Sequence, residues 1–288
     1  MLLAHPDAPA AYAYTGGRPH QPDLPWLVFV HGALNDHCVW TFPARWFAHH
    51  GWNVLALDLP GHGRSAGPVL PDVERSAQWL LHLLAAQGIA QASLVGHSMG
   101  SLIALEAAAQ AATANPADDD AARTQVDRLV LVGTSVPMPV SDALLATSAT
   151  DPLKAIDMVV AFAHARLAGE PGNPGPGTWH HGASRQLSRR ILERSRGVAG
   201  CEHNLFHHDF SLCNRYARGL EAADAVAAAG RTRSHLLLAR RDRMTLPKAA
   251  AEVGRRLGAR THLLDLPGHD LMQEDPEGLL KELREALG

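Results

Sequence analysis

Short apolar runs of strand length alternate with helical stretches along the first half of the chain. The runs are almost wholly apolar, which is typical of strands buried on both faces of a sheet. They cover residues 26–30, 53–57, 92–95 and 128–133, and the helical stretches between them cover residues 39–49, 73–87 and 101–112. This alternation predicts an α/β protein with a mostly parallel, doubly wound sheet. A looser alternation at residues 11–15 predicts an edge strand.

The alternation is interrupted between residues 136 and 230 and then resumes. The later elements are predicted strands at 234–239 and 261–266 and predicted helices at 247–257 and 276–287. The interrupting segment is helical in places, carries a Gly/Pro-rich stretch at residues 169–177 and has no strand pattern. We therefore predict a core domain of residues 1–135 and 231–288. Residues 136–230 are predicted to form a helical lid, inserted before the last two strands and placed over one end of the sheet.

The sequence Gly96-His97-Ser98-Met99-Gly100 stands where a predicted strand passes into a helix. Strand, sharp turn and helix are the context of a nucleophile elbow, which holds a serine at its apex in a strained conformation. The two glycines carry no side chain, so strand and helix can pack closely on either side of the turn. The Ser98 hydroxyl would then stand beside the first amides of the helix, where an oxyanion is stabilised.

A serine hydroxyl becomes a good nucleophile only when a base takes its proton, and that base needs an anion behind it. Both groups are found where the last two predicted strands end. Asp242 follows strand 234–239, and His269 follows strand 261–266. The order Ser98, Asp242, His269 is the chain order of one class of hydrolases and of neither classical protease class.

With these motifs the chain resembles the α/β-hydrolase-fold serine hydrolases, in the branch of lidded esterases, lipases and C–C hydrolases. The resemblance covers nearly the whole length outside the lid. It also rests on residues 31–33, 58–65, 241–243 and 268–269. It implies that Ser98 is the nucleophile, that His269 is the general base and then acid, and that Asp242 orients and stabilises the imidazolium. Relatives with an aspartate nucleophile are disfavoured by the serine.

The resemblance also implies an oxyanion hole made by the backbone amides of Ala33 and Met99, with no cofactor and no metal. Some relatives place the acid after the strand that follows the elbow. Here that strand leads to residues 133–135, and no carboxylate follows until Asp142, so Asp242 remains the predicted acid. His97, next to the nucleophile, is expected to pack against or shape the substrate pocket.

The predicted lid contains aromatic residues and a His/Cys-rich stretch. Trp179 and Phe206 could line the substrate pocket, or they could form the core of the lid. Cysteine, histidine and carboxylate side chains also lie close together in the sequence at residues 201–213. They match no common spacing of a structural zinc site, so we expect polar residues that line or brace the lid.

Composition narrows the possible partners. The chain has 288 residues, of which 46% are hydrophobic and 19% charged, with a net charge of −3. This composition is typical of an ordinary globular protein and gives no reason to expect nucleic acid or a membrane as partner. We expect a monomer or a homodimer. The three cysteines are odd in number and widely spaced, and the N-terminus lacks a signal-peptide pattern, so a cytoplasmic location is expected.

These features predict a serine hydrolase that cleaves a small or medium carboxylic ester through an acyl-enzyme. Two alternatives remain open. One is hydrolysis of a C–C bond in a dienone acid, which would use the same triad and lid. The other is a ligand-binding protein that has kept the fold and lost turnover, for which a damaged triad would be the usual sign.

Overall fold

The computed structural model describes residues 1–114, 124–165 and 180–288. One eight-stranded sheet runs through it in the order β1-β2-β4-β3-β5-β6-β7-β8. β1 and β2 are antiparallel to their neighbours, and every other pair is parallel. The strands are β1 (Leu2–Leu3), β2 (Ala11–Tyr14), β3 (Trp26–Val30), β4 (Asn53–Leu57), β5 (Gln91–His97), β6 (Gln125–Val132), β7 (Arg233–Ala239) and β8 (Arg260–Leu264). The predicted mostly parallel α/β sheet is confirmed.

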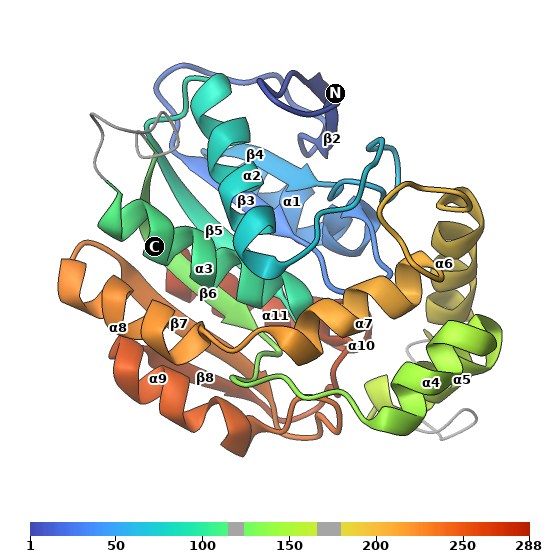
Figure 1. The fold of residues 1–288 in the computed structure, drawn as a ribbon. Helices are drawn as coiled ribbons and strands as arrows, with labels where there is room; N and C mark the ends of the chain where they lie inside the picture. The colour runs from blue at the N-terminus through green and yellow to red at the C-terminus, as the bar shows by residue number, and fades with distance from the viewer. Residues whose placement is uncertain (115–123, 166–179) are drawn as a thin grey trace.

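Helices cover the sheet on both faces (Figure 1). One face carries α2 (Val73–Ala86), α3 (Met99–Thr113), α8 (Gly219–Ala229) and α9 (Ala251–Leu257), which share one large apolar cluster with the strands. The other face carries α1 (Thr41–Ala48), α10 (Leu271–Glu274) and α11 (Pro276–Leu287), with a second cluster. Side chains of a strand alternate between these clusters, as the pleat requires. Val28 and Val30 lie in the first cluster, and Leu27 and Phe29 lie in the second.

Helix ends follow from local capping. The Asp72 carboxylate accepts a hydrogen bond from the Arg75 amide, and α2 begins at the next residue after Asp72. Asp275 caps α11 in the same way through the Gly278 amide, and Pro276 occupies the first helical position. A side-chain acceptor satisfies an amide that the helix itself leaves unpaired, and proline loses nothing at that position. Such signals explain why the predicted bounds of α2 and α11 are nearly those observed.

The segment between β6 and β7 has two kinds of helix. α4 (Asp142–Thr150), α5 (Pro152–Ala163), α6 (His180–Arg194) and α7 (Leu205–Arg215) lie beyond the strand ends. They share an apolar cluster of their own, with Ile156, Ile191 and Phe206 among its members. α8 instead packs between α3 and α9 in the layer that covers the sheet. We call α4 to α7 the cap. The Gly/Pro-rich stretch at 169–177 lies outside the described residues.

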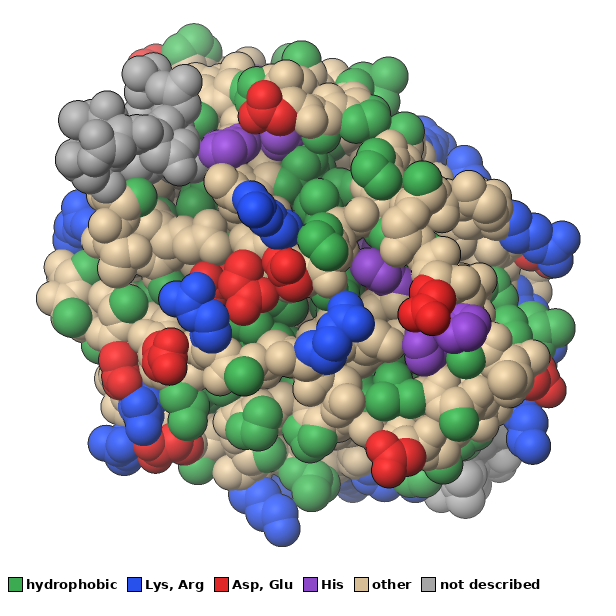
Figure 2. Space-filling model, in the orientation of Figure 1, with side chains coloured by type: hydrophobic (Ala, Val, Ile, Leu, Met, Phe, Trp, Pro, Cys, Tyr) green, Lys and Arg blue, Asp and Glu red, His purple; other side chains and the backbone are tan. Residues whose placement is uncertain are grey.

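On the face in Figure 2, acidic and basic side chains are interspersed with apolar ones. None of the helices in the described ranges is both long enough and apolar enough to pass through a bilayer.

Candidate active site

Ser98 lies at the junction of β5 and α3, and its backbone is strained. Its φ is 52° and its ψ is −121°, a region that residues with a side chain rarely adopt. The Ser98 amide donates to the Val132 carbonyl over 3.0 Å, which ties the turn to β6. Such a strained turn between a strand and a helix is the conformation that the predicted elbow requires.

The two glycines of the elbow are needed for close packing. A Cβ at Gly96 would collide with the backbone carbonyl of Gly100, and a Cβ at Gly100 would collide with the carbonyl of Val30. Neither neighbour can move away, because both are backbone atoms of the central strands or of the helix. The small residues therefore bring α3 directly against β3 and β5 and fix the position of Ser98.

Asp242 and His269 meet above the ends of β7 and β8. The His269 Nδ1 and Asp242 Oδ2 atoms are 2.8 Å apart, and both residues are buried. The Oδ1 atom of Asp242 accepts hydrogen bonds from the amides of Met244 and Thr245, each over 2.8 Å. The Thr245 hydroxyl donates to Asp242 Oδ2 over 2.7 Å and lies 3.1 Å from His269 Nδ1. Four contacts thus hold the carboxylate in one orientation toward the ring.

The charges of this pair reinforce each other. Burial alone would lower the pKa of His269, but the Asp242 carboxylate outweighs it and raises that pKa. Burial alone would raise the pKa of Asp242, but His269, Thr245 and the backbone amides lower it. Asp242 therefore stays ionised and favours a proton on His269 Nδ1, which leaves Nε2 free to accept one.

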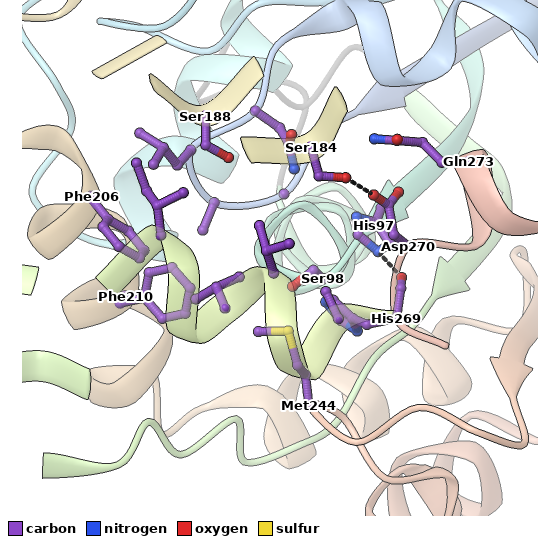
Figure 3. A pocket seen from close by; sticks show the side chains of 18 residues that line it. His97, Ser98, Ser184, Ser188, Phe206, Phe210, Met244, His269, Asp270 and Gln273 are labelled. Carbon is purple, nitrogen blue, oxygen red and sulfur yellow. Dashed lines mark hydrogen bonds between the residues drawn. The ribbon is translucent and has the colours of Figure 1, made fainter. Parts of the chain in front are cut away.

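Ser98 and His269 lie together where two cavities join. Six residues line both cavities: Ala33, Ser98, Val159, Phe210, Met244 and His269. The first cavity carries most of the polar side chains, which come from Asn35, Ser184, Ser188, Asp270 and Gln273 (Figure 3). Apolar side chains such as Val160 and Phe206 complete the first cavity. The second is mainly apolar and includes Met138, Leu144, Met158 and Phe162, with Ser141 and Arg243 at its border. We call them the polar lobe and the apolar lobe.

The amides of Met99 and Ala33 are the two predicted oxyanion donors. Met99 is the first residue of α3, where an amide has no partner inside the helix. Within the described ranges, neither amide donates a hydrogen bond to a protein acceptor. Ala33 lines both lobes beside Ser98. The two predicted donors thus border the same space as the serine.

His97 lines the polar lobe and also contacts His269. Its Nε2 atom lies 2.9 Å from the His269 carbonyl oxygen, and the ring centroids of the two residues are 4.8 Å apart. Burial, with repulsion from His269, lowers the pKa of His97 to about 3. A neutral ring must then donate from Nε2 to the carbonyl, so the predicted shaping role of His97 includes holding the backbone of His269.

Of the two aromatic residues predicted to line the substrate pocket or form the lid core, the structure describes only Phe206. Phe206 of α7 lines the polar lobe and is also buried in the cap cluster, and its contact with substrate stays a prediction. Trp179 lies outside the described residues.

The His/Cys-rich stretch at residues 201–213 is engaged in hydrogen bonds within the protein. His207 Nδ1 lies 3.1 Å from both the Ser148 hydroxyl and the Leu145 carbonyl, which braces α7 against α4. His208 Nε2 lies 2.9 Å from the Leu70 carbonyl. These contacts support the predicted bracing role.

Asp209 joins the cap to the loop that carries Ala33 and Leu34, a contact that no sequence pattern predicted. Its Oδ2 atom accepts from the Leu34 amide over 2.7 Å and lies 2.9 Å from His62 Nε2. Both side chains of the pair are buried. Burial disfavours either charge, yet mutual attraction raises the pKa of His62 and lowers that of Asp209. Leu34 adjoins Ala33 and has a φ of 50°, so this buried ion pair holds a strained loop in place.

Replacing Asp209 by alanine is expected to lower the free energy of unfolding by roughly 3 kcal/mol, because His62 and the Leu34 amide would lose their buried partner. Asp157→Ala is the control, since Asp157 pairs with Arg185 on the surface of the cap. That change is expected to cost at most about 1 kcal/mol. Urea unfolding at pH 7 measures both.

The pH dependence provides a second check on the same pair. A raised pKa contributes stability that is lost when the pH climbs through the folded-state value, so the deficit of Asp209→Ala should shrink once His62 loses its proton. A deficit that is the same for Asp157→Ala and Asp209→Ala at pH 7 would contradict the assignment.

The two other aspartates near His269 are engaged elsewhere. Asp265 lies just beyond β8, is exposed and pairs with Arg240 over 2.6 Å. The predicted strand end at residue 266 was therefore two residues too late. Asp270 accepts from the Ser184 hydroxyl over 2.9 Å and faces the polar lobe. Burial raises the pKa of Asp270.

Two comparisons by sequence bear on this site. Residues 27–282 match the model of the Alpha/beta hydrolase family. The chain is also 38% identical over 95 residues to the 2-succinyl-6-hydroxy-2,4-cyclohexadiene-1-carboxylate synthase of Klebsiella pneumoniae, and 38% identical over 93 residues to that of Escherichia coli. The first match covers 31% of this chain and 35% of the Klebsiella protein. The chain thus spans about a third of the length of these curated relatives.

Solved structures match over the whole chain. The enol-lactonase from Burkholderia xenovorans LB400 has a TM-score of 0.77 at 18% identity, with 100% of this chain and 99% of that chain covered. A thermophilic esterase has a TM-score of 0.73 at 20% identity, with coverages of 100% and 98%. These likenesses establish a shared fold.

Proposed function

Since the chain belongs to the alpha/beta hydrolase family, we propose that it hydrolyses carboxylic esters through an acyl-enzyme formed on Ser98. The observation that carries this proposal is the 2.8 Å contact between His269 Nδ1 and Asp242 Oδ2, beside a serine at a strained elbow. A positioned base with an anion behind it is what a serine nucleophile needs. A chain that only bound its ligand would usually show a damaged triad, and here the serine, the histidine and the aspartate are all present.

In the proposed reaction, Ser98 Oγ attacks the ester carbonyl while His269 Nε2 accepts its proton. The tetrahedral oxyanion is stabilised by the amides of Ala33 and Met99, which are fixed before the charge develops. His269 then donates the proton to the departing alcohol oxygen, and an ester bond to Ser98 remains. Water attacks this acyl-enzyme with the same base, and the second tetrahedral intermediate releases the acid and restores the Ser98 hydroxyl.

The two lobes favour a substrate with an apolar acyl chain and a smaller polar alcohol. The apolar lobe is bordered by α4 and α5, and burial of each acyl methylene there contributes about 0.8 kcal/mol. The polar lobe offers Ser184, Asp270 and Gln273 next to the histidine that protonates the alcohol.

A panel of p-nitrophenyl esters of increasing acyl length tests the proposal, assayed beside a dienone acid. The dienone acid tests the alternative of C–C bond hydrolysis. We retain this alternative because the chain is partly similar to the cyclohexadiene carboxylate synthases. We expect turnover of the esters with a preference for medium acyl chains. Cleavage of the dienone acid alone would replace the ester proposal by the C–C hydrolase.

Narrowing the apolar lobe is expected to change the acyl preference. Met158→Trp adds volume to a side chain that lines this lobe, so kcat/KM for an octanoyl ester should fall about tenfold relative to an acetyl ester. Leu153→Trp is the matched control on the same helix, because Leu153 is 47% exposed and lines neither lobe. If both variants keep the parent order of esters, the acyl chain does not bind in the apolar lobe.

A further inference from the structure

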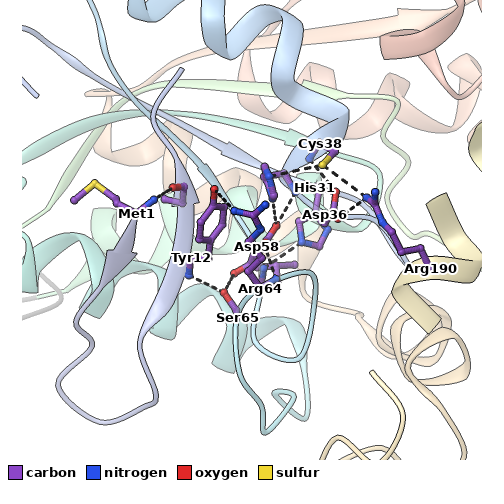
Figure 4. A network of polar contacts seen from close by, with 12 residues as sticks. Met1, Tyr12, His31, Asp36, Cys38, Asp58, Arg64, Ser65 and Arg190 are labelled. Carbon is purple, nitrogen blue, oxygen red and sulfur yellow. Dashed lines mark hydrogen bonds and ion pairs between the residues drawn. The ribbon is translucent and has the colours of Figure 1, made fainter. Parts of the chain in front are cut away.

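A second nucleophilic side chain lies outside the serine site, on the 3-10 helix η1 (His37–Trp40). Cys38 is exposed, and its Sγ atom lies 3.6 Å from His37 Nε2 (Figure 4). The Arg190 guanidinium approaches the same sulfur from α6, and its Nη2 atom lies 3.7 Å from Cys38 Sγ. Two cationic groups from different parts of the chain thus contact one thiol.

The positive charge on His37 is maintained by Asp58. The His37 Nδ1 and Asp58 Oδ1 atoms are 2.7 Å apart, and Asp58 is fully buried. Its Oδ2 atom accepts from the Arg64 amide, so the carboxylate is held from both sides. Burial alone would lower the pKa of His37, but the hydrogen-bonded Asp58 raises it to about 9. At neutral pH the ring is an imidazolium that donates from Nδ1 to Asp58 and from Nε2 to the sulfur.

Asp36 is the remaining charged group at the sulfur, and it is neutralised locally. Its Oδ2 atom pairs with Arg190 over 3.1 Å, and its Oδ1 atom accepts from the Cys38 amide over 2.9 Å. Asp36, His37 and Cys38 could offer ligand atoms to a cation, but the guanidinium already occupies the space between two of them. The guanidinium therefore already takes the place next to the sulfur that a metal ion would need.

We propose that Cys38 is a modification site, an exposed thiol in contact with an imidazolium and a guanidinium, and that it exchanges with low-molecular-weight disulfides. Cationic neighbours and partial exposure are the surroundings in which cysteines react. The thiolate attacks one sulfur of the disulfide, and a new S–S bond to Cys38 forms as the bond in the reagent breaks. The other half leaves as a thiolate and takes a proton from solvent, so Cys38 is oxidised and the reagent is reduced.

The other two cysteines provide an internal comparison. Burial raises the pKa of the Cys201 thiol to about 11, and burial also raises the pKa of Cys213. Neither thiol has a hydrogen bond to a cationic side chain within the described part of the chain. Both should be slow to react under conditions in which Cys38 reacts.

The modification would act on the cap, and this step rests on the proposed function. Arg190 belongs to α6, the helix whose Ser184 and Ser188 line the polar lobe. Its contacts with Asp36 and Cys38 fasten that helix to the loop that follows β3 and carries Ala33. A group attached to the sulfur would disturb the contact with Arg190 and add bulk between α6 and this loop. We therefore expect α6 to loosen and ester turnover to change when Cys38 is modified.

The test follows disulfide exchange of the full chain with glutathione disulfide at pH 6, read by mass spectrometry of the three cysteine peptides. Cys38 should react at least tenfold faster than Cys201. Arg190→Gln, a change at a half-exposed side chain, should slow Cys38 several-fold, and Arg190→Lys should restore much of the rate because the charge is kept. His37→Asn should slow it about tenfold. Exchange of Cys38 at the rate of Cys201, or unchanged rates in folded Arg190→Gln and His37→Asn, would overturn the proposal.

Hydrogen exchange of residues 180–194 tests whether the contacts of Arg190 with Asp36 and Cys38 hold α6 in place, without any assay of turnover. Amides of α6 should exchange faster after glutathione is attached, whereas Cys38→Ser treated identically should not change. Equal protection in modified and unmodified protein would remove the link to the cap. If the chain hydrolyses no ester, the exchange rates of Cys38 and of α6 still report on this inference, so the two proposals fail separately.

Discussion

Ser98→Ala is expected to abolish ester hydrolysis, with a loss in kcat of up to about 10⁶, the magnitude seen when a serine hydrolase loses its nucleophile. The acyl-enzyme cannot form without Oγ, while the pocket and the oxyanion donors remain. Alanine has the same backbone requirements as serine at this φ of 52°, so the fold should be retained. Hydrolysis of a p-nitrophenyl ester and covalent labelling by a fluorophosphonate measure the effect, and circular dichroism checks the fold.

Ser188→Ala is the matched control, because Ser188 lines the polar lobe but lies on α6. This variant should be labelled at Ser98 as the parent is. Labelling of another residue in the parent, or full activity of a folded Ser98→Ala protein, would rule out the acyl-enzyme on Ser98.

Asp242→Asn is expected to lower kcat by about 10⁴, the effect of the equivalent change in serine proteases. An asparagine keeps the shape of the side chain, and its carbonyl oxygen or amide can still contact the ring and Thr245. It no longer fixes the proton on His269 Nδ1 or stabilises the imidazolium. Because the carboxylate raises the pKa of His269, its loss should also move the acidic limb of the kcat/KM profile to lower pH.

The variants Asp265→Asn and Asp270→Asn test whether a neighbouring aspartate, rather than Asp242, is the acid of the triad. Asp265 pairs with Arg240 in solvent, so its change should leave kcat within about twofold. Asp270 faces the polar lobe through Ser184, so its change should affect KM more than the acidic limb. A folded Asp242→Asn protein with normal kcat beside an inactive Asp270→Asn protein would transfer the acid role to Asp270.

Much of the fold could be predicted from local pattern. β3, β4 and α11 were predicted with the bounds that the structure has, because buried parallel strands are continuously apolar and the helix has its own cap and Pro276. β1 was missed, since Leu2 and Leu3 are too short a run to show a period. They form a strand only through their pairing with Tyr12 and Ala11.

Part of the candidate site could also be predicted from the sequence. Ser98, Asp242 and His269 were predicted because each follows a recognisable strand, and an α/β sheet brings the carboxyl ends of its strands to one edge. The elbow could also be predicted from the sequence, because only glycine fits at positions 96 and 100, where the chain lies directly against neighbouring backbone atoms.

Other parts of the site depended on tertiary structure. Thr245, which bridges Asp242 and His269, stands in a loop with no periodic signal. The pairing of Asp209 with His62 spans 147 positions, and that of Arg190 with Asp36 spans 154. Local pattern reports which face of an element is buried, because that depends on neighbours three or four positions away. A contact between the cap and the sheet depends on how two separately folded surfaces meet, so only the folded chain decides which polar side chains become partners.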